Sequence, residues 1–123
     1  MKPQTKRNVV IVDDDPAVRD SLIVILSLAG QNVTAFSCAE DLLSALPVLA
    51  PDVLVIDVQM PHMGGLELVR RINARGLQIP TILISGNAAD SLQSSAEQVG
   101  VSHILKKPFS GLDLLTLMDR MFG

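Results

Sequence analysis

Short aliphatic runs recur along the chain and are separated by stretches with a helical repeat. The runs lie at residues 9–12, 33–36, 53–56, 81–84 and 102–105. The first, third and fourth are apolar at every position or nearly so, which is typical of strands that are covered on both faces in a parallel sheet. We therefore expect each run to be a strand of one sheet.

The stretches between and after these runs predict helices. In the first, apolar positions 18, 22, 25, 26 and 29 share one helical face, and Gly30 is placed to end the helix. The other four helices are expected at residues 37–46, 65–75, 89–99 and 110–122. The second helix opens with a capping box, Ser-Cys-Ala-Glu at residues 37–40, and stops before Pro47. The fourth stretch has few apolar positions, so it is the weakest of the five helix predictions.

Strand and helix alternate five times in this pattern. Such alternation predicts a doubly wound α/β sandwich, in which helices cover both faces of a parallel sheet. No internal repeat, low-complexity tract or linker divides the sequence. We expect a single domain over residues 1–123, with a flexible N-terminal tail over residues 1–7.

Charged and hydroxyl side chains follow four of the predicted strands. Asp13 and Asp14 come after the first strand, and Asp57 comes after the third. Ser85 follows the fourth strand, and Lys107 follows the fifth. Reactive groups in sheets of this kind gather at the carboxyl ends of the strands. We therefore expect these five side chains to converge on one edge of the sheet.

The three consecutive aspartates after the first strand have different expected roles. Asp15 directly precedes Pro16, so it is expected to cap the N-terminus of the first helix. Asp13 and Asp14 have no such task, and together with Asp57 they offer carboxylate oxygens to a hard divalent cation. Mg²⁺ fits this site, because it binds to a few carboxylates and keeps several waters.

The same residues suit phosphoryl chemistry. A carboxylate such as that of Asp57 can attack phosphorus and form an acyl phosphate. The cation would then neutralise phosphoryl oxygens, while Ser85 donates a hydrogen bond to one of them and Lys107 pairs with another. The residues alone are thus compatible with Mg²⁺-dependent phosphoryl transfer to Asp57.

Composition narrows the class of protein. Of 123 residues, 48% are hydrophobic but only 2% are aromatic, and the net charge is −3. The chain therefore lacks the basic surface and the aromatic stacking platforms that nucleic-acid binding uses. Its single cysteine cannot form an internal disulfide. Only four apolar residues follow the basic N-terminal start, too few for a signal peptide, and no apolar run is long enough for a membrane span. We expect a cytoplasmic domain that binds neither nucleic acid nor membrane directly.

Four motifs, VDDDP, VIDVQMPHMGG, ILISG and LKKPF, together resemble the receiver domain of two-component response regulators, in particular receivers of transcription regulators. The resemblance covers essentially the whole chain. It implies a flavodoxin-like sheet of five parallel strands in the order 2-1-3-4-5, with five helices. It also implies a signalling switch that accepts a phosphoryl group from a sensor histidine kinase or a phosphotransfer protein, slowly dephosphorylates itself, and controls an output domain or target protein.

The resemblance assigns roles at the acidic site. Asp57 matches the phosphoacceptor of the family. Asp14 matches a direct ligand of Mg²⁺, and Asp13 matches a ligand that acts through water. Gln59 matches the position whose main-chain carbonyl completes the metal shell. A domain of this kind catalyses only its own phosphorylation and dephosphorylation.

The resemblance also assigns a switch, with one departure from the family. Ser85 matches the switch hydroxyl, and Lys107 matches the lysine that pairs with the phosphoryl group. Lys107 is followed by Pro108, and the family usually has a cis bond there. Three residues before that lysine the family places Tyr or Phe, whereas this chain has Ile104. The aromatic half of the switch is therefore missing.

Two other functions compete with this interpretation. A Mg²⁺-dependent phosphohydrolase with an aspartyl nucleophile would need a second acid near Asp57 for proton transfer, and Val58 and Gln59 offer none. A phosphate-independent interaction module would be expected to lack Asp57, Lys107 or the acidic pair, and all are present. The last helix carries too many apolar residues for one buried stripe, which suggests a homodimer contact on the face of the fourth and fifth helices.

Overall fold

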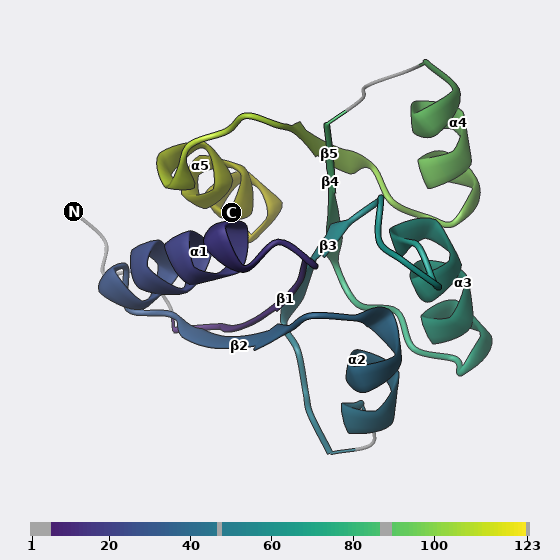
Figure 1. The fold of residues 1–123 in the computed structure, drawn as a ribbon, viewed down its shortest axis with the longest axis horizontal. Coiled ribbons are helices and arrows are strands. Elements are labelled where there is room, and N and C mark those ends of the chain that lie inside the picture. Colours follow the sequence, from purple (N-terminus) through teal and green to yellow (C-terminus); the bar gives the residue numbers. More distant parts are fainter. Residues whose placement is uncertain (1–5, 47, 87–89, 123) are drawn as a thin grey trace.

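The computed structural model describes residues 6–46, 48–86 and 90–122, and strands alternate with helices throughout these segments (Figure 1). The strands are β1 (Asn8–Val12), β2 (Asn32–Phe36), β3 (Val53–Asp57), β4 (Thr81–Ser85) and β5 (His103–Lys106). The helices are α1 (Pro16–Leu28), α2 (Ala39–Ala45), α3 (Gly65–Ala74), α4 (Asp90–Gln98) and α5 (Gly111–Phe122). Every strand and helix that the sequence pattern predicts is present, and its bounds differ only slightly from those expected.

The five strands of the described segments form one parallel sheet in the order β2-β1-β3-β4-β5. α1 and α5 cover one face of the sheet, and α2, α3 and α4 cover the other (Figure 1). This arrangement confirms the flavodoxin-like, doubly wound fold. Because all strands are parallel, their carboxyl ends lie on the same edge.

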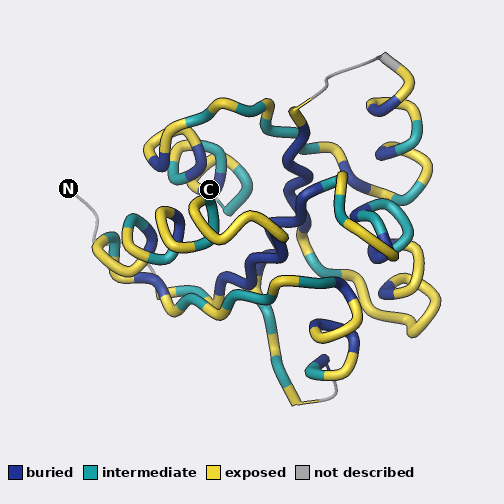
Figure 2. The backbone as a smooth tube through the Cα atoms, in the orientation of Figure 1, coloured by how far each residue is buried: buried dark blue, intermediate teal, exposed yellow. Residues whose placement is uncertain are grey.

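The central strands are buried on both faces, which explains their continuous aliphatic runs. β3 and β4 are buried at every position, and they form the dark centre of Figure 2. Side chains of β1 alternate between two cores. Val10 and Val12 pack under α2, α3 and α4, whereas Val9 and Ile11 pack under α1 and α5.

The beginning of α1 agrees with the sequence, and the beginning of α2 does not. Asp15 Oδ1 accepts a hydrogen bond from the Ala17 amide at 2.9 Å, which confirms the predicted cap. The capping box expected at residues 37–40 is wrong. α2 begins after Cys38, which makes no side-chain cap hydrogen bond. The expected box needs Ser37 as the N-cap, but the N-cap is Cys38. Glu40 is therefore not at the third helical position, from which its side chain could accept a hydrogen bond from the N-cap amide.

A capping box that we did not predict occurs at α5. The Ser110 hydroxyl accepts a hydrogen bond from the Asp113 amide at 3.1 Å, and the Asp113 carboxylate accepts one from the Ser110 amide at 3.0 Å. Each side chain therefore satisfies a backbone donor that the first turn leaves open. This box fixes the start of α5 close to Lys107.

The apolar residues of α5 are packed more fully than their number suggests. Leu112 is 71% exposed. The other six are buried or partly buried in the core under α1 and α5: Leu114, Leu115, Leu117, Met118, Met121 and Phe122. Leu112 is thus an exposed apolar residue of α5, whereas the other six pack inward because α5 contacts both the sheet and α1. Gly111 lies directly against the Ile25 side chain of α1.

The N-terminal end of the described chain is held by two contacts. The Arg7 amide donates to Gln31 Oε1 at 2.8 Å, and the Arg7 guanidinium lies 4.2 Å from the centre of the Phe122 ring. Residues 1–5 of the expected tail, and Pro47 at the expected end of α2, lie outside the described residues. The domain bounds stay a prediction. Within the described segments, no helix has the length and apolar character needed to cross a membrane.

Candidate functional site

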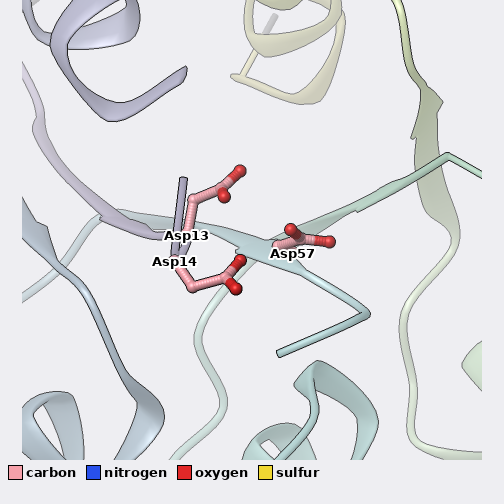
Figure 3. Close-up of side chains that lie close together, drawn as sticks. All are labelled: Asp13, Asp14 and Asp57. Carbon is pink, nitrogen blue, oxygen red and sulfur yellow. The ribbon is translucent and has the colours of Figure 1, made fainter. Parts of the chain in front are cut away.

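Three carboxylates meet where β1 and β3 end (Figure 3). Asp13 and Asp14 follow β1, and Asp57 is the last residue of β3. One carboxylate oxygen from each residue lies within 4.8 Å of those of the other two. β1 and β3 are paired in register, with Val12 opposite Ile56. The pairing therefore places the residues that follow Val12 beside Asp57, and the predicted convergence of the acids is confirmed.

The two adjacent acids have different surroundings. Asp13 is fully buried, whereas Asp14 is exposed. Asp13 Oδ1 accepts a hydrogen bond from the Asp15 amide at 2.9 Å. Asp13 Oδ2 is buried and has no hydrogen-bond partner among the described residues. A buried carboxylate oxygen without a donor is unfavourable unless a cation lies close to it.

Lys107 supplies the positive charge of the site. Its Nζ atom lies 3.2 Å from Asp57 Oδ2, to which it donates a hydrogen bond, and 3.4 Å from Asp13 Oδ2. The Lys107 amide donates to the Ser85 carbonyl at 2.8 Å, so the loop after β5 is tied to the end of β4. The bond between Lys107 and Pro108 is cis, as expected. One ammonium group thus faces two buried carboxylates.

Burial and charge shift the pKa values of two of these groups. Burial raises the pKa of Asp13 above its ordinary value, and the negative charge of Asp57 adds to this, although the Asp15 amide and Lys107 act in the opposite direction. Burial lowers the pKa of Lys107, but the hydrogen bond to Asp57 and the two carboxylate charges outweigh it and raise the pKa overall. Lys107 therefore stays charged, and an added cation would relieve the excess of negative charge.

The Asp57 side chain and backbone are both held in place. Asp57 is 4% exposed, and its Oδ1 atom accepts a hydrogen bond from the Gln59 amide at 3.1 Å. The start of α3 packs directly behind it. A Cβ atom on Gly65 would lie 2.5 Å from the Asp57 carbonyl oxygen and 2.9 Å from Ile56 Cγ2. Only glycine permits this approach, so α3 fixes the backbone that carries Asp57.

The remaining predicted residues lie around this centre. Ser85 is buried at the end of β4, next to the strand that carries Asp57. The side chain of Gln59 is exposed. Ile104 of β5 lies opposite Leu83 and packs against the core under α2, α3 and α4, not among the acids. The structure brings together Asp13, Asp14, Asp57 and Lys107, and the individual roles stay predictions.

Two features of the site escaped the sequence analysis. One is the close packing of Gly65. The other is Arg19 of α1, whose Nη1 atom donates to the Asp13 carbonyl oxygen at 2.7 Å. No spacing motif points to either contact, because each depends on the direction in which the chain enters a helix.

A cleft of about 590 Å³ opens beside Lys107, between the start of α1 and the start of α5. Its lining includes Val18, Leu22, Gly86 and Phe109. Lys107 itself lines this cleft, so the cleft adjoins the acidic site. Clustered carboxylate oxygens suit a hard divalent cation, and an ammonium group beside them suits an anion. Together they can hold a phosphoryl group.

Residues 9–119 match the family model described as the response regulator receiver domain. The transcriptional regulatory protein FixJ of Bradyrhizobium diazoefficiens is 40% identical over 114 residues, which cover 93% of this chain and 55% of FixJ. The DNA-binding transcriptional regulator NtrC of Klebsiella pneumoniae is 37% identical over 110 residues, which cover 89% of this chain and 24% of NtrC. The chain thus spans about half the length of FixJ and about a quarter of NtrC.

The chain is also similar to solved structures of receiver domains. The crystal structure of FixJ-N has a TM-score of 0.85 at 32% identity and covers 95% of this chain and 94% of that one. The BeF3-activated DrrB receiver domain has a TM-score of 0.84 at 25% identity and covers 96% of this chain and 98% of that one.

Proposed function

The chain belongs to the response regulator receiver domain family, whose members are phosphoacceptor regulatory domains of two-component signalling, and we propose that its phosphoacceptor is Asp57. The observation that carries this assignment is the setting of the Asp57 carboxylate. It is almost fully buried at the carboxyl end of β3, Lys107 donates a hydrogen bond to it, and Asp13 and Asp14 face it. The two adjacent acids suit metal binding as a pair, which leaves Asp57 opposite them as the nucleophile.

We infer that the cation is Mg²⁺, held by Asp14 directly, by Asp13 through water, by Asp57 and by the main-chain carbonyl of Gln59. The donor set fits this ion, because Mg²⁺ prefers oxygen ligands and retains waters. Asp13, Asp14 and Asp57 together carry more negative charge than the Lys107 ammonium beside them balances, which supports a further cation nearby. When bound, the ion supplies positive charge to the phosphoryl oxygens in the transition state.

The transfer step follows from the positions of the side chains. An oxygen of Asp57 attacks the phosphorus of a phosphohistidine on the partner. A P–O bond forms as the P–N bond breaks, and the imidazole leaves with the electron pair and takes up a proton. Lys107 stays beside the phosphoryl group and balances its charge, and Ser85 donates its hydroxyl to a phosphoryl oxygen. Later, water attacks the phosphorus, which returns the Asp57 carboxylate and inorganic phosphate.

Acyl-phosphate labelling tests the assignment of Asp57. The wild type and Asp57→Asn are incubated with Mg²⁺ and acetyl phosphate, and the gain of one phosphoryl group is measured by intact mass spectrometry. Asp57→Asn should not be labelled, because an amide cannot form the acyl phosphate. Asp15→Asn is the matched control, since it removes a neighbouring charge and leaves a side chain that also caps α1. Undiminished labelling of Asp57→Asn would overturn the assignment.

We propose that the phosphodonor is a sensor histidine kinase or a phosphotransfer protein, and that the receiver controls an output domain or target protein in transcription regulation. The support comes from the relatives. FixJ and NtrC are named as transcription regulators, and both are longer than the part that this chain matches. A DNA-binding output domain would therefore lie in a part of the protein other than this receiver.

We also propose that phosphorylation changes self-association or partner binding on the face formed by α4, β5 and α5. α4 is held by few buried side chains, Leu92 and Ala96 among them. A shift of this helix therefore requires little free energy. Leu112 offers an exposed apolar contact on α5.

Light scattering with and without beryllofluoride and Mg²⁺ measures the change in molecular mass. Hydrogen exchange over residues 87–122 measures the shift of the helices. If neither the mass nor the exchange in this region changes, this face does not carry the output.

A further inference from the structure

We propose that Arg19 is a positioning residue for the cation site: it holds the peptide between Asp13 and Asp14 in the orientation that directs the Asp14 carboxylate toward Asp57. This inference rests on the proposed Mg²⁺ site and adds a residue that makes no contact with the phosphoryl group.

The contact that carries the inference is short and partly buried. Arg19 Nη1 donates to the Asp13 carbonyl oxygen at 2.7 Å. The Arg19 amide donates to the Asp15 carbonyl at 3.1 Å, so Arg19 is itself fixed by the first turn of α1. A hydrogen bond from a charged donor at this distance is stronger than a neutral one. Arg19 therefore links the first helix to the acidic turn that precedes it.

This link matters because the Asp13 carbonyl and the Asp14 amide belong to one rigid plane. The Asp13 side chain is held separately, since its Oδ1 atom accepts a hydrogen bond from the Asp15 amide. Asp14 has no comparable support. Its side chain is exposed and makes no hydrogen bond with any described residue. The direction of its carboxylate therefore depends on the backbone, and Arg19 is the side chain that holds this peptide.

Charge and position have opposite effects on Mg²⁺ affinity. Arg19 carries a positive charge near three carboxylates, so its charge alone weakens their attraction for a cation. If charge were its main effect, removing Arg19 would tighten Mg²⁺ binding. If Arg19 positions Asp14, removing it would weaken binding, because residues that orient metal ligands typically contribute about 10- to 100-fold in affinity. The sign of the change therefore separates the two effects.

The experiment measures the Mg²⁺ dissociation constant by NMR titration, following the backbone amides of Asp14 and Asp15 in isotopically labelled protein. The chain has no Trp or Tyr, so intrinsic fluorescence is not suited to it. Arg19→Met should weaken Mg²⁺ binding by about tenfold. Arg19→Lys keeps the charge and one donor group, and its dissociation constant should lie between those of Arg19→Met and the wild type.

Arg75 provides a matched control. Its Nη1 atom also donates to a backbone carbonyl at 2.7 Å in a partly buried setting, but the acceptor is Leu43. Arg75 ends α3 at the edge of the sheet opposite the acids. Arg75→Met should therefore lower the melting temperature without Mg²⁺ about as much as Arg19→Met does, yet leave the Mg²⁺ dissociation constant within about twofold of the wild type.

Each possible result of these titrations either supports or overturns the positioning role of Arg19. Equal or tighter Mg²⁺ binding by Arg19→Met overturns the positioning role, and so does an equal loss of affinity in Arg75→Met. If Arg19→Met does not fold, Arg19→Gln, which is too short to reach the carbonyl, should show the same loss of affinity, and an unchanged constant overturns the proposal. Failure of the wild type to bind Mg²⁺ would overturn the cation site itself, and the wild-type titration shows this directly.

Discussion

Asp14 offers the clearest test of the cation site, because its carboxylate can be neutralised without breaking a contact. It is exposed and makes no side-chain hydrogen bond with the described residues, yet it lies within 4.8 Å of the Asp13 and Asp57 carboxylates. At that separation, and with a dielectric constant near that of water, each pair repels by about 0.9 kcal/mol. The Lys107 ammonium beside Asp13 and Asp57 offsets part of this repulsion, so Asp14→Asn should stabilise the Mg²⁺-free domain by about 1 kcal/mol at low salt.

This gain is measurable as a melting temperature. In a domain of 123 residues, 1 kcal/mol corresponds to about 4 °C, so Asp14→Asn should melt about 4 °C above the wild type without Mg²⁺. Added Mg²⁺ reverses the order. An ion that binds only the folded state stabilises it by about 2.7 kcal/mol at 100 times its dissociation constant, or about 10 °C here. The wild type should show this shift, and Asp14→Asn should lose most of it.

The assay is thermal unfolding followed by circular dichroism, with and without saturating Mg²⁺ at fixed pH and low salt. Asp15→Asn is the control: it removes an adjacent charge, keeps the α1 cap, and should retain the Mg²⁺ shift. Our account of the site is refuted if wild-type melting does not respond to Mg²⁺. It is also refuted if Asp14→Asn melts below the wild type without Mg²⁺ or keeps the full shift.

Two further predictions concern Lys107 and Gly65. Because the pKa of Lys107 is raised above 10.5, its stabilising effect is fully present below that pH and is lost as the pH rises through the folded-state value. Lys107→Met should therefore lower the free energy of unfolding by about 1 kcal/mol at pH 7, and denaturant titrations should show this gap closing above pH 10.5; a constant gap would contradict the ion pairing. Gly65→Ala places a Cβ 2.5 Å from the Asp57 carbonyl oxygen, so it should destabilise the domain by about 2 kcal/mol and slow the phosphorylation of Asp57. Gly86→Ala is the control, because a Cβ there meets nothing within 4 Å. It should lower the free energy of unfolding by less than about 0.5 kcal/mol in the same denaturant titrations. Equal effects of the two glycine substitutions would show that the packing of α3 against β3 is not tight.

The fold was predictable because its centre is encoded locally. β3 and β4 are covered on both faces, so every position in them must be apolar or packed, and a run of such residues indicates a central parallel strand. The convergence of Asp13, Asp57 and Lys107 was predictable for a related reason. Parallel strands end on one edge, so residues far apart in sequence meet there without any knowledge of their side-chain directions.

Helix starts were harder to predict, because several residues near a start can act as caps. Ser37 and Cys38 both follow β2, and the helix begins after the second of them, so the expected box does not form. At α5, Ser110 and Asp113 have the spacing of a box and do form one. The pattern of residue types therefore does not decide by itself which of several candidate residues becomes the cap.

Contacts that depend on how a helix packs against its neighbours were not predictable. Gly65 resembles any turn glycine in the sequence, and its importance appears only when β3 is placed behind it. Arg19 resembles a solvated helix residue until the Asp13 carbonyl is seen within its reach. The apolar residues of α5 likewise suggested an exposed face, because the sequence does not reveal that α1 lies against this helix.

Ile104 limits how a change at the acidic edge can travel through the domain. Its side chain packs against the core under α2, α3 and α4 and has no polar atom that could bond to a moving neighbour. Rotating it into solvent would expose apolar surface and gain no hydrogen bond in return. We therefore expect the proposed switch at Ser85 to act through α4 more than through β5.

α4 is not held equally at its two ends. Near its end, the Asn73 side chain of α3 donates a hydrogen bond to the Val99 carbonyl at 2.9 Å, and Ala96 is fully buried. Near its start, Leu92 is the buried apolar anchor among the described residues. A shift of α4 should therefore pivot about its C-terminal end. Hydrogen exchange with beryllofluoride should then change more at residues 90–93 than at 96–99, and Asn73→Ala should remove this difference by freeing the pivot; equal changes along α4 in the wild type would argue against it.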